Sequence, residues 1–412
     1  MPTIAVLGTF DTKGHELAFL ADAIRREGLA VLSIDVGSLD APSVSADVSR
    51  TDVLANSQED WKSVLARKDR GECVALMARA GARHLSRLVA EGKVGGVISL
   101  GGSGGTAIAT SAMRSLPIGF PKVMVSTVAS GNTAAYVGTV DIVMIPAIVD
   151  VAGINRVSRV IFENAAGAIC GMVKAAEQRR LNSPAGKPIV VASMFGNTTA
   201  CVNEARRIVE EAGYEVLVFH ATGSGGRAME SLIESGMVAG VLDITTTEWA
   251  DELVGGVLTA GPQRLDAAAK AKVPSIVVPG CLDMVNFGEP ATIPEKFKGR
   301  NFYHHNPQIT LMRTTAAECV ELGRILADKV NQYKAPTTVL IPRRAISIIS
   351  APGQAFHDPA ADAALFESIK SNLKKSVPLI EIEADINDPS FARRCSETLL
   401  SLMKAAGAGE AA

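Results

Sequence analysis

Short apolar runs alternate with amphipathic segments along the first half of the chain. Four runs rich in β-branched residues predict strands at Ile4–Leu7, Ala30–Asp35, Val94–Leu100 and Lys122–Ser126. Each run ends in a loop of small residues, and the first loop is followed by helical spacing over His15–Glu27. This order of strand, loop and helix is typical of βαβ units, so we predict an α/β fold built on parallel strands.

The same pattern begins again at Pro188, after the polar segment KAAEQRRLNSPAGK. The stretch IVVASMFGNTTACVNEARRIVEEAGYEVLVFHATG parallels IAVLGTFDTKGHELAFLADAIRREGLAVLSIDVG, VAGVLDITT parallels VGGVISLGG, and PSIVVPG parallels PKVMVST. A segment of roughly Ser38–Gly81 is found in the first series alone. We therefore predict two Rossmann-like lobes with mostly parallel sheets, residues 1–180 and 187–412, related by internal duplication. The alternative is that any two such lobes share period and composition.

The pattern changes after Pro307 and predicts elements that complete the second lobe. Helices are expected near Ala316–Tyr333, near Ala361–Asn372 and from Pro389, and strands near Thr338–Ile341, Ala345–Ser350 and Leu379–Ile382.

Composition points to a small-molecule partner. The 41 basic and 43 acidic residues give a formal net charge of -2, which argues against a nucleic acid or an anionic membrane as partner. The six cysteines show no C-x-x-C spacing, so a reducing cytoplasm is expected. The start of the chain lacks a signal-peptide pattern, and no uninterrupted apolar run reaches membrane-spanning length. We expect a cytoplasmic protein that is neither exported nor embedded in a membrane.

The loop GTFDTKG follows the first strand, at the edge where open parallel sheets bind ligands. Its hydroxyl groups and its lysine suit phosphate oxygens, and Asp11 offers a hard oxygen ligand for Mg²⁺ or an acceptor for ribose. The candidate binding residues are Gly8, Thr9, Asp11, Thr12 and Lys13. Alternatively, Asp11 or Thr12 is a plain helix N-cap.

The loop LGGSGGT after the third strand is the stronger phosphate candidate. Its glycines remove side chains where a strand leads into a helix, so a polyphosphate can approach the backbone. The candidate residues are Gly101, Gly102, Ser103, Gly104, Gly105 and Thr106. The loop matches neither the Walker pattern nor the G-x-G-x-x-G fingerprint. The alternative is that it only permits tight packing of strand and helix.

Two further loops of the first lobe carry suitable polar groups. Ser130, Gly131 and Asn132 follow the fourth strand and offer donors to phosphate or to a base. Asp35 ends the second strand, where acidic residues accept ribose hydroxyls in dinucleotide folds. Asp141 and Asp150 flank an apolar run and are weaker metal candidates.

The loops of the second lobe carry side chains in place of glycines. Polar, loop-like segments bring together carboxylates and imidazoles suited to general acid or base catalysis, namely Asp283, His304, His305, His357 and Asp358. Asn286 and, as a weaker nucleophile candidate, Cys281 lie in the same PGCLDMVNFG segment. The alternative is that these are surface residues without a catalytic role.

Several of these segments together resemble a known family. GTFDTKG, IDVG, GGSGGT, PGCLDMVNFG, HNPQITLMRTT and PGQAFHDPAAD are similar to an uncharacterised bacterial and plant family that includes the amino-terminal ATP-binding domain of the tomato mosaic virus resistance protein. The resemblance spans nearly the whole chain and implies two Rossmann-like lobes, ATP with Mg²⁺, and a homodimer. It implies no particular reaction.

We therefore expect an ATP-dependent enzyme, a hydrolase or a phosphoryl or nucleotidyl transferase, that acts on a small polar metabolite. One alternative is a nucleotide-responsive binding module without catalysis. A second alternative, an NAD(P) dehydrogenase, is weakened by the missing fingerprint.

Overall fold

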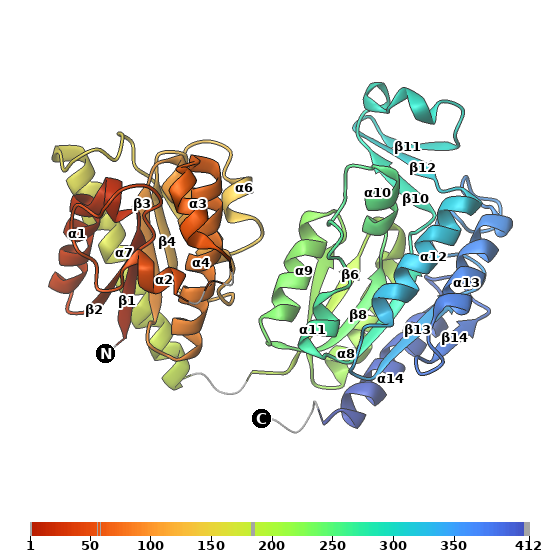
Figure 1. Cartoon of the computed structure of the whole chain (residues 1–412). Helices are drawn as coiled ribbons and strands as arrows, with labels where there is room; N and C mark the ends of the chain where they lie inside the picture. The colour runs from red at the N-terminus through yellow and green to blue at the C-terminus, as the bar shows by residue number, and fades with distance from the viewer. Residues whose placement is uncertain (1, 56, 58, 183–185, 408–412) are drawn as a thin grey trace. The chain divides into compact units, whose positions relative to one another are not determined.

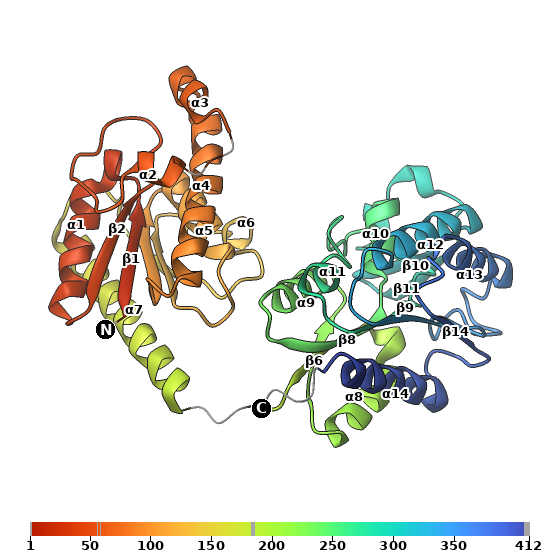
Figure 2. The same cartoon turned by 60° about the horizontal axis from the view of Figure 1, so that its bottom comes forward.

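The computed structural model describes residues 2–55, 57, 59–182 and 186–407. The chain divides into two compact units, Met1–Pro184 and Ala185–Ala412, which we call the first and the second lobe. Figures 1 and 2 show each lobe as a sheet with helices packed on it.

A five-stranded parallel sheet in the order β2-β1-β3-β4-β5 forms the centre of the first lobe. Its strands are β1 (Thr3–Gly8), β2 (Ala30–Asp35), β3 (Gly96–Gly101), β4 (Lys122–Ser126) and β5 (Val143–Pro146). The inner strands β1, β3 and β4 are almost fully buried. Burial on both faces explains why they read as continuous apolar runs.

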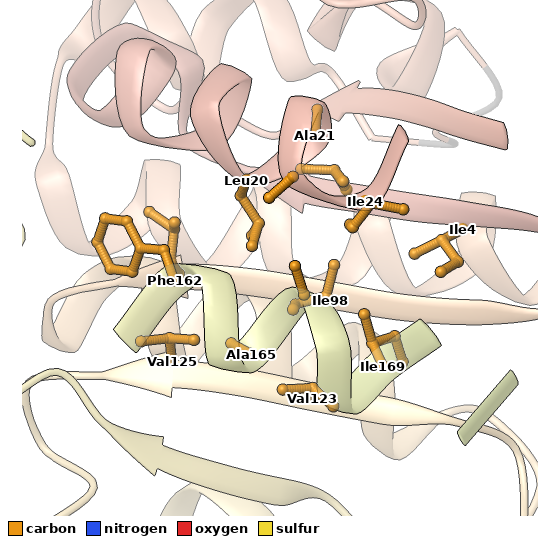
Figure 3. Close-up of a cluster of buried hydrophobic side chains, with 14 of the residues drawn as sticks. Ile4, Leu20, Ala21, Ile24, Ile98, Val123, Val125, Phe162, Ala165 and Ile169 are labelled. Atoms are coloured by element: carbon orange, nitrogen blue, oxygen red, sulfur yellow. The ribbon is translucent and has the colours of Figure 1, made fainter. Parts of the chain in front are cut away.

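Helices cover both faces of this sheet. They are α1 (Phe10–Arg26), α2 (Arg50–Leu54), α3 (Trp61–Arg67), α4 (Arg70–Ala90), α5 (Ser103–Arg114), α6 (Ala134–Val137) and α7 (Arg156–Asn182). Leu20 and Ile24 of α1 and Ile169 of α7 pack on Ile98 and Val123 of the strands, as Figure 3 shows. Helices α4 and α5 cover the opposite face, where a second apolar cluster lies.

The second lobe repeats this architecture. Its six-stranded sheet has the order β14-β13-β9-β8-β6-β7, and all its pairings are parallel. The strands are β6 (Ile189–Met194), β7 (Glu215–His220), β8 (Val238–Thr245), β9 (Ser275–Gly280), β13 (Thr337–Pro342) and β14 (Leu379–Ile382). Strands β6, β7, β8 and β9 occupy the places that β1, β2, β3 and β4 have in the first sheet. An internal duplication leaves this pattern.

Helices also cover both faces of the second sheet. They are α8 (Thr199–Glu211), α9 (Ser224–Glu234), α10 (Glu248–Val254), α11 (Ala267–Ala271), α12 (Ala316–Val330), α13 (Pro359–Asn372) and α14 (Pro389–Ala405). The apolar faces of α8 and α14 share one buried cluster, and those of α10, α12 and α13 share another. Short 3₁₀ turns lie at Gly196–Thr198, Pro290–Thr292 and Glu295–Phe297.

A small antiparallel sheet in the second lobe is missing from the sequence prediction. It has the order β10-β12-β11 and consists of β10 (Met284–Phe287), β11 (Phe302–Asn306) and β12 (Ile309–Arg313). The prediction that the histidines of β11 lie in a loop is wrong. Strand β11 is an edge strand, and its last three residues, His304, His305 and Asn306, are all exposed, so polar side chains are tolerated there.

Two other predicted boundaries are also wrong. Ala345–Ser350 is a turn and not a strand, because the Ser350 hydroxyl accepts hydrogen bonds from the backbone N–H groups of Ile346 and Ser347. The loop Gly8–Gly14 is shorter than predicted, since α1 begins at Phe10 and has non-helical backbone angles at Lys13.

One buried guanidinium joins three elements of the second lobe. Arg264 is 1% exposed, and its Nη1 and Nη2 donate to both oxygens of Asp243 in β8 at 2.6 and 2.5 Å. Its Nε donates to Glu248 of α10 at 2.7 Å, and Nη1 donates to Glu230 of α9 at 3.0 Å. Burial raises the pKa of Glu230, although Arg264 opposes that shift. The three carboxylates of this cluster, Asp243, Glu248 and Glu230, therefore all depend on the guanidinium of Arg264.

We predict that Arg264→Met destabilises the second lobe by about 3–5 kcal/mol, because it leaves buried carboxylates without their cation. The chain has two tryptophans, so in a Trp61→Phe background the buried Trp249 reports urea unfolding of this lobe. The control is Arg207→Met, whose side chain is 49% exposed and pairs with Glu204 and Glu211. It should leave the free energy of unfolding nearly unchanged, because exposed ion pairs contribute little to stability. Equal unfolding midpoints for both variants would contradict the prediction.

Candidate functional site

The carboxyl ends of β1 and β3 lie at the switch point of the first sheet. The chain leaves β1 towards β2 on one side and leaves β3 towards β4 on the other, with α1 and α5 on opposite faces. Open α/β sheets bind ligands at such switch points. The two predicted loops meet there, because a Cβ atom added to Gly105 would lie 3.8 Å from the Thr9 hydroxyl oxygen.

The start of α5 presents backbone N–H groups without side chains around them. No described side chain caps this helix end, and the first N–H groups of a helix have no partner within it. A Cβ atom on Gly104 would meet only Arg70 Nη2 at 3.6 Å, and one on Gly102 only the Thr127 hydroxyl at 3.8 Å. The space beside these glycines can therefore take an anion.

The second lobe contains the same tripeptide at the start of α9, where it has a different partner. Ser224–Gly226 repeats the Ser-Gly-Gly of Ser103–Gly105. Glu248 Oε1 accepts hydrogen bonds from the N–H groups of Gly223 and Gly226 at 2.7 and 3.1 Å. The protein's own carboxylate thus occupies the helix N-terminus in the second lobe, whereas no described side chain does so at α5.

Two carboxylates lie beside each other at the ends of β1 and β2. Asp35 Oδ1 accepts from the N–H groups of Phe10 and Gly37 at 3.2 and 2.7 Å. Asp11 Oδ2 accepts from the N–H groups of Ser38 and Leu39 at 3.1 and 3.0 Å. A Cβ atom on Gly37 would come within 2.9 Å of both Asp11 and Asp35. Burial, and to a smaller degree the charge of Asp11, raises the pKa of Asp35.

Asp11 Oδ1 is buried and has no hydrogen-bond partner among the residues that the structure describes. A carboxylate oxygen that is free, beside a second carboxylate, is suited to a hard divalent cation. Within the same residues no group of three or more His, Cys, Asp or Glu side chains is placed to hold a metal. A cation at Asp11 would therefore take further ligands from a bound phosphate or from water, as Mg²⁺ commonly does.

Lys13 and the two threonines of the first loop make internal contacts. Lys13 Nζ donates to the carbonyl oxygen of Val151, in the segment after β5. An ammonium has three donors, so two remain for a ligand. The hydroxyl groups of Thr9 and Thr12 lie 2.9 Å apart.

The other predicted residues of the first lobe lie at the same edge of the sheet, and some of them make hydrogen bonds that stabilise the fold. The Thr106 hydroxyl is fully buried and lies 2.6 Å from that of Ser126, which ties α5 to β4. Ser130, Gly131 and Asn132 are exposed, and Asn132 Oδ1 accepts from the N–H of Ala134 at the start of α6.

Asp141 does not lie with these residues. It pairs at 2.6 Å with the ammonium of Lys122, the first residue of β4, and so lies at the amino ends of the strands. Lys122 is fully buried, so this carboxylate neutralises a buried charge. Asp141 therefore lies away from the other candidates of the first lobe, and its carboxylate is already paired with Lys122. Asp150 is exposed after β5.

Sequence reasoning missed two arginines of the first lobe. Arg70 begins α4 and lies beside Gly104. Arg50 begins α2, its Nη1 is buried without a partner among the described residues, and its charge lowers the pKa of Asp35 slightly. Both belong to the segment that the second lobe lacks. The insertion was the signal in the sequence that could have pointed to these two arginines. Within it, both arginines directly follow helix N-cap residues, Ser49 and Asp69.

Among the predicted acid/base residues of the second lobe, Asp283 and His357 are connected through Ser347 and Ser350. Asp283 is fully buried, its Oδ2 accepts from the Ser347 hydroxyl at 2.7 Å, and burial raises its pKa to about 6. Asp358 caps α13 through the N–H of Ala361, and His357 Nδ1 lies 3.2 Å from the Ser350 carbonyl oxygen. His304 and His305 lie on β11.

Cys281 is not suited to nucleophilic attack. It is fully buried, and burial raises the pKa of its thiol well above the usual value. A thiol of this kind stays protonated at neutral pH.

The second lobe has a cavity of about 630 Å³ at the carboxyl ends of β6 and β7. Of the predicted residues, His305 and Asn286 line it. The remaining lining residues are Phe195, Gly196, Asn197, His220, Thr222, Val257, Leu258, Phe287, Gly288, Tyr303, Gln308, Ile309, Leu311, Ile348 and Ile349. The sequence could not reveal this cavity because its wall includes the unpredicted strands β10, β11 and β12.

In the part of the chain that the structure describes, the helices are too short or too polar to cross a membrane.

Comparison with known proteins gives relatives over the whole chain. A UPF0261 protein of Clostridium tetani is 48% identical over 402 residues, covering 97% of this chain and 99% of that protein. The ToMV resistance protein Tm-1(GCR237) of Solanum lycopersicum is 40% identical over 421 residues, covering 97% of this chain and 56% of the tomato protein. The resemblance found in the sequence is therefore confirmed.

Solved structures are much less similar. The UDP-GlcNAc 2-epimerase of Methanocaldococcus jannaschii has a TM-score of 0.23 at 12% identity, covering 67% of this chain and 83% of that one. The glycosyltransferase SnogD from Streptomyces nogalater has a TM-score of 0.19 at 12% identity, covering 98% of this chain and 99% of that one. Scores this low carry no argument about function.

The two lobes match the two halves of one family description. Residues 2–178 match the N-terminal domain, and residues 187–403 match the C-terminal domain, of the uncharacterised protein family UPF0261. The chain belongs to the uncharacterised protein family UPF0261.

Proposed function

We propose that the first lobe binds ATP with Mg²⁺ at the carboxyl ends of β1 and β3. The observation that carries this proposal is the contrast between the two Ser-Gly-Gly helix starts. At α9 the site is filled by Glu248, whereas at α5 it is open to an external anion. Backbone N–H groups at a helix N-terminus favour phosphate. The choice of ATP among phosphate ligands rests on the family resemblance.

Each group of the site has a role in this proposal. The N–H groups at Ser103, Gly104 and Gly105 and the hydroxyl of Thr9 hold phosphate oxygens. Arg70 beside Gly104 adds a guanidinium, which suits phosphate geometry. Asp35 and the exposed loop Ser130–Asn132 contact the nucleoside.

Asp11 is the residue that would hold Mg²⁺, because its Oδ1 is free while Oδ2 is anchored to the backbone. Bound there, the metal would neutralise charge on the phosphate oxygens. The backbone N–H groups that fix Oδ2 keep the free oxygen in place without help from a ligand.

The proposal extends to catalysis on a second, small substrate, as expected from the sequence. The second lobe has a separate cavity of a size that fits a small molecule.

A branched side chain in the glycine loop should block the nucleotide. We expect Gly104→Val to lower the affinity for Mg-ATP at least about a hundredfold, or about 2.7 kcal/mol, because it fills the space that a phosphate would occupy. The fold should persist, since the nearest atom to the new Cβ is 3.6 Å away. Calorimetric titration of the full chain measures the change. Gly167→Val in α7, where a new Cβ meets no atom within 4 Å, is the matched control. Unchanged affinity in Gly104→Val would remove this loop from the site.

Loss of the charge on Asp11 should weaken the metal-dependent part of binding. Asp11→Asn keeps an acceptor for the backbone but loses the charge, so affinity for ATP should fall about ten- to a hundredfold with Mg²⁺. With EDTA in place of Mg²⁺ the affinity should equal that of the unsubstituted chain. Asp22→Asn, on the exposed face of the same helix, is the control. Binding should saturate at one nucleotide per chain, and a loss that is the same with and without Mg²⁺ would contradict the metal role.

Turnover separates the enzyme from the module. Purified chain with ATP, Mg²⁺ and a panel of small metabolites should release ADP, AMP or phosphate in steady turnover. Gly104→Val should release none, because it cannot hold the nucleotide. Release at equal rates from both proteins, or from neither, would favour the non-catalytic module.

A further inference from the structure

The cavity of the second lobe lies at the switch point of the second sheet. The chain leaves β6 towards β7 on one side, while β8 and β9 follow on the other. Phe195 and Asn197 directly follow β6, and His220 ends β7. Strands β10, β11 and β12 form the opposite wall. The position is the one where open parallel sheets bind ligands, and its volume of about 630 Å³ is that of a typical small-molecule site.

The lining selects against charged ligands. Among the described residues that line the cavity, no Asp, Glu, Lys or Arg is present. Aliphatic and aromatic side chains dominate. The rings of Phe195 and His220 meet edge to face at 5.5 Å between centroids, and the rings of Tyr303 and His305 are tilted, with 6.4 Å between centroids. Aromatic rings in a lining favour a ring-bearing ligand, which can stack on them or contact their edges.

One buried acceptor in the lining has no donor. Asn286 is 1% exposed, and its backbone N and its Nδ2 donate to the two oxygens of Asp251 at 2.8 and 2.6 Å. These two bonds fix the orientation of the amide. Its Oδ1 accepts no hydrogen bond from any residue that the structure describes. A buried acceptor of this kind calls for a donor from outside the protein.

We propose that this cavity binds a neutral, ring-bearing small molecule that donates an O–H or N–H hydrogen bond to Asn286 Oδ1. This ligand is less polar than the metabolite expected from the sequence. The inference does not depend on nucleotide binding in the first lobe, and it is tested without ATP.

The test uses two probes of nearly equal shape, indole, which carries an N–H donor, and benzothiophene, which carries none. Titration of the full chain by ligand-observed NMR gives both affinities. Indole should bind at least about fivefold more tightly, the contribution expected of one hydrogen bond to a buried acceptor. Asn286→Leu should reduce this preference to near unity while benzothiophene still binds.

A second variant tests the location without touching Asn286. Ile348→Trp should abolish binding of both probes by filling the cavity, and it should fold normally because Ile348 is 51% exposed. Val320→Trp on α12, where Val320 is 49% exposed and outside the cavity lining, is the matched control and should bind as the unsubstituted chain. Failure of both probes to bind, or undiminished binding to Ile348→Trp, would overturn the site. Equal affinity for indole and benzothiophene would overturn the role of Asn286.

Discussion

Both lobes are governed by the burial of parallel strands on two faces. Val97, Leu100 and Val125 in the first sheet, like Val190 and Val277 in the second, have no exposed surface. A sheet covered in this way has little room for unpaired polar groups in its middle, because each would be desolvated without a partner. Polar side chains and free backbone groups are therefore concentrated at the strand ends. The candidate sites of both lobes lie at the carboxyl ends for this reason.

A Ser-Gly-Gly helix start occurs in both lobes but at different places in the topology, because α5 follows β3 whereas α9 follows β7, the counterpart of β2. In the first lobe the residues after β3 are glycines, which leave the start of α5 open. In the second lobe the segment after β8 ends in Glu248, whose carboxylate reaches the start of α9. A Cβ atom on Gly226 would clash with that carboxylate, so the glycine makes space for an internal anion. One glycine-rich helix start thus serves the fold, and the other remains available for a ligand.

Sequence reasoning succeeded for the elements that local pattern determines. The apolar runs predicted β2, β4 and β14 with their bounds, and the βαβ rhythm predicted the parallel pairing of both large sheets. It failed where long-range pairing decides the structure. Strand β11 carries polar residues and pairs with β12, and the role of Asp141 depends on Lys122, from which it is separated in the chain by the rest of β4 and by α6.

The candidate site residues show the same division between local sequence pattern and long-range pairing. Asp11, Thr9 and Gly101–Gly105 could be found because they directly follow strands. Arg50 and Arg70 reach the site through the fold of an insertion, and Asn286 lies beside the cavity only because β10 pairs with β12. ATP, Mg²⁺ and the homodimer stay predictions.

The internal carboxylate of the second lobe also explains the neutral character of its cavity. Glu248 brings a negative charge into a buried region, where it shares the single positive charge of Arg264 with Asp243 and Glu230. This single guanidinium faces three carboxylates, so it has no donor capacity left for an external phosphate. Because Glu248 occupies the start of α9 and Arg264 is committed to carboxylates, neither group is left to bind an external phosphate. The surface near the ends of β6 and β7 is instead apolar, with neutral hydrogen-bonding groups, and this combination favours an uncharged ring over a phosphate.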